Sequence, residues 1–125
     1  MRYVGKLDTA LYSCITKDIS TDEIIITDNQ ILHILERHPE AYCDFLSHIQ
    51  EALKSPDYIL ADKHVNTGLI IKKFFWNKEH IQIVLRLCTS TDNADYKNSI
   101  ISYWKISDKR LENYLRNKRI LYKKE

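Results

Sequence analysis

Two histidines and an arginine lie close together in one short segment of the sequence. His33, Arg37 and His38 belong to the stretch EIIITDNQILHILERHP, which spans residues 23–39. An imidazole exchanges protons near neutral pH and a guanidinium binds anions, so this combination can serve proton transfer and phosphate binding together. A packed core residue is the structural alternative for His38, and a solvated surface residue is the alternative for His33.

The residues around these histidines predict the elements that position them. The isoleucine run at 24–26 favours a strand, and Thr27 begins a capping pattern that starts a helix. Pro39 cannot continue that helix, so His38 is expected at its C-terminal end. At about 100° per residue, His33 shares a polar stripe with the arginine, whereas His38 projects with the apolar residues.

Length and composition indicate a single domain spanning residues 1–125. With 125 residues, 44% of them hydrophobic, the chain can bury one core without disulfides or a metal. Cys14, Cys43 and Cys88 have no metal-ligand spacing and suggest thiols in a reducing compartment. The hydrophobic runs are too short to cross a bilayer. We therefore expect a cytoplasmic protein with no metal, no cofactor and no membrane contact.

The basic residues gather near the C-terminus. The net charge of +2 is by itself too mild to indicate nucleic-acid binding. Between residues 105 and 125, however, lysines and arginines outnumber carboxylates, and Tyr114 and Tyr122 lie among them. Such a face, including Lys123 and Lys124, can follow a phosphate backbone and stack bases, although a charged C-terminal segment is often only a solvated surface.

The hydrophobic pattern along the chain predicts an α+β fold. Residues 3–15 are read as short extended or irregular segments, and a second amphipathic helix is expected to end near Lys54. The period then changes to two, and a final helix is expected from Ser107 to about Lys118. The expected strands lie near residues 58–60, 68–76, 80–88 and 98–106. We expect N-terminal helices packed on one face of a four-stranded antiparallel sheet, with a closing C-terminal helix.

Several polar side chains on the expected strands could serve chemistry. Lys72 alternates with apolar residues, and Arg86 lies opposite a fully apolar row, although either could be an ordinary surface strand residue. Asn98 and Ser99 open the last strand. The sequence shows neither a carboxylate cluster nor a glycine-rich phosphate loop. A set of His, Lys, Arg, Ser, Asn and Tyr suits RNA cleavage without a metal, in which the ribose 2′-OH attacks the phosphate.

Motifs along nearly the whole chain resemble one known group of proteins. In order, these motifs are YVGKLD, TDEIIITDNQILHILERHP, SPDYIL, NTGLIIKKF, LRLCTSTDNADYKNSIISYWKIS and YLRNKRILYKK. They are similar to the phage-associated members of the barnase, EndoU, colicin and RelE-like nuclease superfamily. The helix motif HIxxRHP matches residues 33–39, the strand lysine matches Lys72, and NSII matches residues 98–101, with Ser102 where the family often has Thr. The resemblance implies a compact α+β fold and metal-independent RNase activity.

These observations lead to one functional hypothesis and two alternatives. We predict an endoribonuclease that acts by 2′-OH transesterification and binds RNA, with a protein inhibitor or a phage structural protein as a further possible partner. The alternatives are a non-catalytic RNA-binding module and a toxin-like protein-interaction domain with an apolar patch at 74–76. The catalytic candidates His33, His38, Lys72 and Ser99 are expected in one cleft, and the substrate-binding candidates are Arg37, Arg86, Asn98, Lys123 and Lys124.

Overall fold

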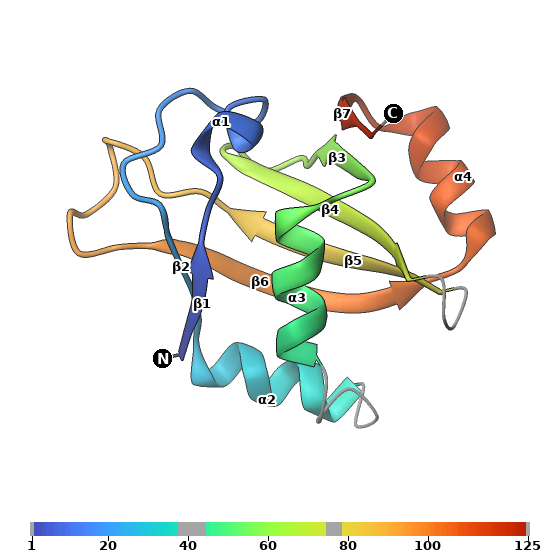
Figure 1. Cartoon of the computed structure of the whole chain (residues 1–125), viewed down its shortest axis with the longest axis horizontal. Helices are drawn as coiled ribbons and strands as arrows, with labels where there is room; N and C mark the ends of the chain where they lie inside the picture. The colour runs from blue at the N-terminus through green and yellow to red at the C-terminus, as the bar shows by residue number, and fades with distance from the viewer. Residues whose placement is uncertain (1, 38–44, 75–78, 125) are drawn as a thin grey trace.

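The described parts of the chain, residues 2–37, 45–74 and 79–124, form a mixed sheet and four helices in a computed structural model (Figure 1). The sheet has seven strands in the order β1-β2-β6-β5-β4-β3-β7. The strands are β1 (Arg2–Lys6), β2 (Glu23–Ile26), β3 (Tyr58–Ala61), β4 (Thr67–Phe74), β5 (Glu79–Arg86), β6 (Asn98–Ile106) and β7 (Ile120–Lys123). The helices are α1 (Thr9–Tyr12), α2 (Asp28–Arg37), α3 (Phe45–Lys54) and α4 (Asp108–Asn117).

The four strands expected from the sequence form the centre of this sheet. β3, β4, β5 and β6 are antiparallel neighbours, as predicted. The prediction of a four-stranded sheet is nevertheless wrong, because β7 adds to β3, β2 adds to β6 in parallel, and β1 adds to β2. β2 forms at the isoleucine run that predicted a strand, whereas the two edge strands are irregular or short: β1 carries a bulge and β7 has only four residues. Such short edge strands have too little alternation to be recognised without their neighbours.

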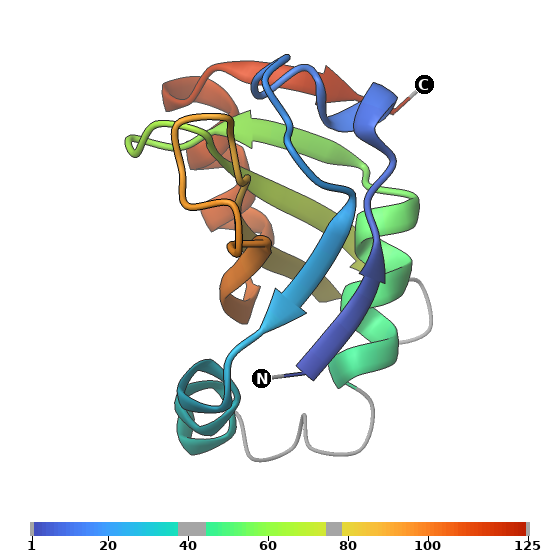
Figure 2. The same cartoon turned by 90° about the vertical axis from the view of Figure 1, so that its left-hand side faces the viewer.

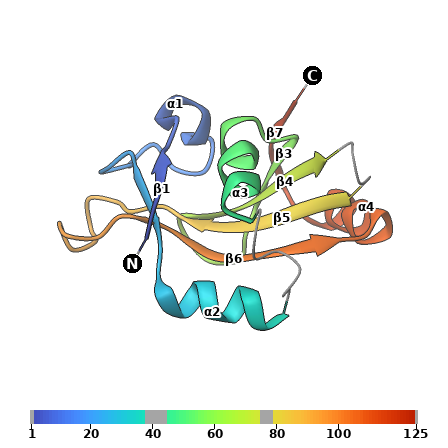
Figure 3. The ribbon, with the colours of Figure 1, turned by 60° about the horizontal axis from the view of Figure 1, so that its bottom comes forward.

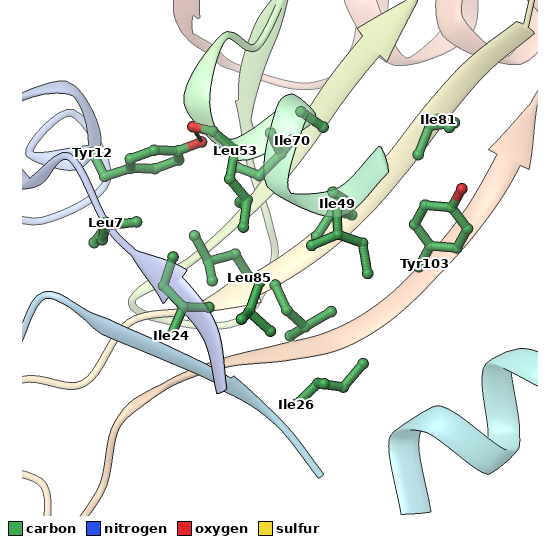
Figure 4. Close-up of a cluster of buried hydrophobic side chains, with 14 of the residues drawn as sticks. Leu7, Tyr12, Ile24, Ile26, Ile49, Leu53, Ile70, Ile81, Leu85 and Tyr103 are labelled. Atoms are coloured by element: carbon green, nitrogen blue, oxygen red, sulfur yellow. Dashed lines mark hydrogen bonds between the residues drawn. The ribbon is translucent and has the colours of Figure 1, made fainter. Parts of the chain in front are cut away.

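The sheet separates two hydrophobic layers, which we call the α3 face and the α4 face (Figure 2). On the α3 face, Tyr12, Ile34 and Ile49 of the first three helices belong to one core with central-strand residues such as Ile81. Figure 4 shows Tyr12, Ile49 and Ile81 in this layer. On the α4 face, Leu111 packs against a smaller set of strand residues, namely Leu60, Leu69, Ile71 and Ile106. The closing C-terminal helix expected from the sequence is α4, and it covers part of this second face.

Helix α2 lies along a part of β6 that has no neighbouring strand. β2 pairs with only Asn98 and Ser99 of β6, so the outer edge of β6 beyond them is left to α2 (Figure 3). The helix begins as predicted, because the Gln30 N–H donates to Thr27 Oγ1 at 3.2 Å. Ile34 is buried against the core, and the opposite side of α2 is exposed.

The cap predicted for the last helix is also present. Ser107 Oγ accepts a hydrogen bond from the Arg110 N–H at 3.1 Å, and Asp108 occupies the first turn of α4. This cap fixes where β6 ends and α4 begins, and so brings the N-terminus of α4 close to the start of β5.

Candidate active site

The structure separates two residues that the sequence predicted to share one cleft. Lys72 pairs with Ile81 on β5, so its side chain lies on the α3 face. Ser99 pairs with Arg86, which lies an odd number of residues farther along β5 and therefore on the α4 face. A single cleft holding both Lys72 and Ser99 is therefore wrong.

A bulge in β6 explains this error. Val84 pairs with Ser102 while Leu85 pairs with Ile100, which leaves Ile101 as an extra residue in the strand. An extra residue reverses the face of everything beyond it. Strict alternation places Ser99 and Tyr103 on one face, but in the structure Tyr103 belongs to the core of the α3 face.

The structure describes two of the three site residues predicted for the first long helix. His33 and Arg37 are exposed on α2 and, four positions apart, share one side of it. His38 lies outside the described residues, so its role stays a prediction from the sequence.

Asn98 occupies a buried position at the junction of β2 and β6. It has no exposed surface. Its Oδ1 accepts from the Cys88 N–H at 2.8 Å, and its Nδ2 donates to the carbonyls of Thr21 at 2.8 Å and Glu23 at 3.1 Å. The side-chain amide of Asn98 therefore binds backbone groups. Because it is also fully buried, this geometry does not support a direct contact between Asn98 and substrate.

Arg86 is already paired with a carboxylate. Its Nη2 and Nη1 donate to Asp92 at 2.9 and 3.4 Å, and Asp92 also accepts from the Thr89 N–H at 2.8 Å. The hydrogen bonds from Arg86, followed by that from Thr89, lower the pKa of Asp92 to about 2. The pair therefore links the end of β5 to the loop that connects β5 with β6.

A shallow groove of about 330 Å³ runs beside Arg86 on the α4 face, and His64 is part of its wall. The imidazole Nδ1 of His64 lies 2.9 Å from Asp62 Oδ2. Burial opposes ionisation of Asp62, but hydrogen bonds from His64 still lower the pKa of that carboxyl. The sequence reasoning did not select His64. Lys123 and Lys124 lie farther away, at the end of the edge strand β7.

Lys72 has the most unusual environment among the predicted residues. Its side chain lies on an apolar row between Ile70 and Phe74, and only 8% of the residue is exposed. The nearest carboxylate in the described chain is Asp57, whose Oδ1 is 4.0 Å from Lys72 Nζ. The other oxygen of Asp57 already accepts from the Lys73 N–H at 2.7 Å. The ammonium of Lys72 is therefore nearly buried and only loosely compensated.

Three further polar side chains lie near Lys72 on the α3 face. His48 of α3 has its ring centroid 4.8 Å from that of Phe74, and its Nδ1 lies 3.4 Å from the Tyr103 hydroxyl. Lys105 pairs with Ile81 from the side opposite Lys72, so the two lysines flank one isoleucine. We call Lys72, His48, Tyr103 and Lys105 the α3-face cluster.

This cluster combines an imidazole, a phenol and two ammonium groups, the types that proton transfer and phosphate stabilisation require. Sequence reasoning selected only Lys72. Tyr103 and Lys105 lie two positions apart on one strand, which was a usable signal, whereas nothing in its own segment distinguishes His48 from a packed helical histidine. The apolar patch expected at 74–76 is not supported by Phe74, which is buried; residues 75 and 76 lie outside the described parts.

Within the described residues, no three His, Cys, Asp or Glu side chains gather closely enough to hold a metal ion. No helix in the same part of the chain is long and apolar enough to cross a membrane.

Comparison with known proteins identifies a family for this chain. No curated protein and no solved structure matches the chain. A family model described as phage-Barnase-EndoU-ColicinE5/D-RelE like nuclease2 matches residues 4–123, which is almost the whole sequence. The match includes the end of β1 and every later element up to β7. The chain therefore belongs to this phage-associated family of barnase, EndoU, colicin and RelE-like nucleases.

Proposed function

We propose that the protein is an endoribonuclease that cleaves RNA by 2′-OH transesterification and that the α3-face cluster is its active site. The family is one of nucleases, which supports phosphodiester cleavage as the reaction class. The observation that carries the proposal is the nearly buried, loosely paired side chain of Lys72 on the same face of the sheet as the contact between His48 and Tyr103.

The position of Lys72 is costly for a residue with only a structural role. A buried cation normally has a close carboxylate, because burial without compensation is strongly unfavourable. Among the described residues, the one carboxylate near Lys72 is at the 4.0 Å limit of an ion pair. A phosphate bound at Lys72 Nζ would supply the missing negative charge, and the same contact would stabilise the extra charge of the phosphorane.

His48 and Tyr103 supply the groups that can move or position protons. In the proposed reaction His48 removes the proton from the ribose 2′-OH, and the Tyr103 hydroxyl holds the imidazole from the strand side. His48 is only partly buried, so the ring can reach a bound strand. Lys105 adds positive charge at the exposed edge of the cluster. His38 remains a sequence-based candidate for the acid that protonates the leaving 5′-oxygen.

The test is cleavage of single-stranded RNA by the purified protein in excess EDTA. We expect 2′,3′-cyclic phosphate ends and no cleavage of the matching DNA, because DNA has no 2′-OH. Lys72→Met keeps most of the side-chain volume and should lower kcat by about 10²–10³, the range seen for loss of one electrostatic stabiliser. Lys17→Met removes the same charge from an exposed position outside the cluster and should cleave at the parental rate.

Two results would contradict the proposal. Activity that disappears with EDTA and returns with magnesium would indicate metal-dependent chemistry. Activity that survives Lys72→Met but is lost in Ser99→Ala would place the chemistry on the α4 face instead.

A further inference from the structure

The α4 face carries a cavity at the same end of the sheet as Lys72. Lys72 and Lys73 are successive strand residues and therefore project to opposite faces. The cavity has a volume of about 410 Å³, within the range of roughly 300–1,000 Å³ for small-molecule sites. Its walls are formed by Asp57, Tyr58, Ile71, Lys73, His80, Leu111 and Lys124.

Two ammonium groups at this cavity have no carboxylate partner among the described residues. Lys124 Nζ donates only to the neutral Ser55 Oγ at 3.4 Å, and Lys73 forms no ion pair. The backbone beneath them is firmly held: the Asp57 N–H donates to the Ile71 carbonyl at 2.8 Å, and the Lys124 N–H donates to the Asp57 carbonyl at 2.9 Å. The cavity therefore presents two ammonium groups and the carboxylate of Asp57 on a rigid strand end, and the excess of positive charge suits an anionic ligand.

A buried histidine in the cavity wall has an unused hydrogen-bonding atom. His80 is 8% exposed, and its Nε2 lies 2.6 Å from Asp108 Oδ1. A carboxylate only accepts, so Nε2 carries the hydrogen and Nδ1 of the neutral ring is an acceptor. No described residue donates to Nδ1. Nδ1 itself is buried, so a ligand in the cavity meets the imidazole ring of His80 rather than this nitrogen.

The remaining wall is apolar and aromatic. Ile71 and Leu111 are buried members of the α4-face core, and the half-buried Tyr58 packs against the same core. Together they provide a surface against which a flat, apolar ring can lie. The cavity thus has an apolar wall that includes Tyr58, a histidine that is hydrogen-bonded to Asp108, and two lysines.

We propose that this cavity binds one nucleotide of the RNA strand, with its base against Tyr58 and Leu111 and its phosphate at Lys73 and Lys124. The inference rests on the proposed function: a strand whose scissile phosphate lies at Lys72 passes the sheet end, where Lys73 projects to the other face. Asp57, which lines the cavity, accepts a hydrogen bond from the ribose or the base.

Binding is tested without cleavage, by NMR titration with each of the four ribonucleoside 5′-monophosphates and with inorganic phosphate. We expect tighter binding of a nucleotide than of phosphate, with shifts at Tyr58 and His80. Replacing both Lys73 and Lys124 by Met should weaken nucleotide binding about tenfold or more, whereas Lys17→Met should leave it unchanged. Equal binding in the double variant and Lys17→Met, equal binding of phosphate and nucleotide, or no nucleotide binding would each overturn the proposal.

Kinetics separate this inference from the proposed active site. With an RNA oligonucleotide, Lys73→Met should raise KM while kcat stays within about twofold, and Lys72→Met should lower kcat. Nucleotide binding by a protein that never cleaves RNA would refute the proposed activity and leave the cavity assignment standing. RNA cleavage by a protein whose nucleotide binding does not depend on Lys73 and Lys124 would refute the cavity assignment and leave the proposed activity standing.

Discussion

Lys72 and His48 show what residue-scale sequence analysis can and cannot identify. Lys72 was recognisable because a charged residue interrupts an otherwise apolar alternation along one strand. His48 was not, because its contact with Tyr103 joins residues far apart in the sequence and exists only once α3 packs on β6. The charge of Lys72 serves the proposed chemistry but does not stabilise the fold, because the residue is nearly buried among apolar side chains.

We predict that Lys72→Met leaves the free energy of unfolding unchanged or raises it by about 1 kcal/mol. Removal of one partner destabilises a close buried ion pair, but Asp57 is 4.0 Å away, partly exposed and still accepts from the Lys73 N–H, so the variant leaves no buried charge without a partner. Urea unfolding followed by circular dichroism measures this effect, with Lys17→Met as the control. A clear loss of stability in Lys72→Met alone would show that Lys72 is an internal structural partner of Asp57.

The Arg86–Asp92 pair predicts a specific dependence of stability on pH. Arg86 lowers the pKa of Asp92 to about 2 in the folded protein, against 3.8 as the ordinary value. A lowered folded-state pKa stabilises the fold above the ordinary value, and that contribution is lost as the pH falls from about 4 to about 2. Asp92→Asn should therefore lower Tm at pH 7, and its difference from the parent should shrink between pH 4 and pH 3. A Tm difference that is constant over this range would contradict the assignment.

At the scale of elements, the strength of a local pattern decided what could be predicted. The bounds of β6 and the cap of α4 match the prediction because the strand residues and the capping residues are each neighbours in the sequence. β1 and β7 were missed because a short edge strand is defined by the neighbour with which it pairs. The parallel pairing of β2 with β6 likewise depends on the long return of the chain, which no local pattern encodes.

Tyr12 connects the short helix α1 to the end of α3 through a buried hydrogen bond (Figure 4). Its hydroxyl donates to the Leu53 carbonyl at 2.7 Å in the core. Burial, with smaller effects of nearby Cys14, Asp8 and Tyr122, raises the pKa of Tyr12, so the phenol remains a donor. Tyr12→Phe leaves that carbonyl unsatisfied and should cost about 1–3 kcal/mol in urea unfolding. Tyr3→Phe, at an exposed position, should cost almost nothing; equal losses would refute the role of the hydroxyl.

Gly68 allows β4 to pass close beneath Ile15. A Cβ at Gly68 would lie 2.5 Å from Ile15 Cδ1. Gly68→Ala forces the end of the Ile15 side chain to move and should destabilise the protein by about 1 kcal/mol through overpacking. Ile15→Val deletes the clashing Cδ1, so the double variant should lose less than the sum of the single losses, which a double-mutant cycle in urea measures. Additive losses would show that the contact is unimportant.

At the scale of the whole molecule, the sheet divides the predicted site into two sets of residues. Lys72 belongs with His48, Tyr103 and Lys105 on the α3 face, whereas Ser99 belongs with Arg86 on the α4 face. The sequence could supply the residue types and the nuclease family, but not this division, since one bulge in β6 reverses the face of a strand. The proposed strand path uses both faces at one end of the sheet, through Lys72 and then Lys73.

The position of the scissile phosphate tests this account most directly. A crystal structure of the protein with an RNA oligonucleotide that carries 2′-deoxy or 2′-fluoro substitutions would trap the uncleaved strand. The account predicts a phosphate oxygen within about 3 Å of Lys72 Nζ, with the His48 ring facing the 2′-position of the preceding ribose. A scissile phosphate bound at Arg86 and Ser99, with the α3 face unoccupied, would contradict it.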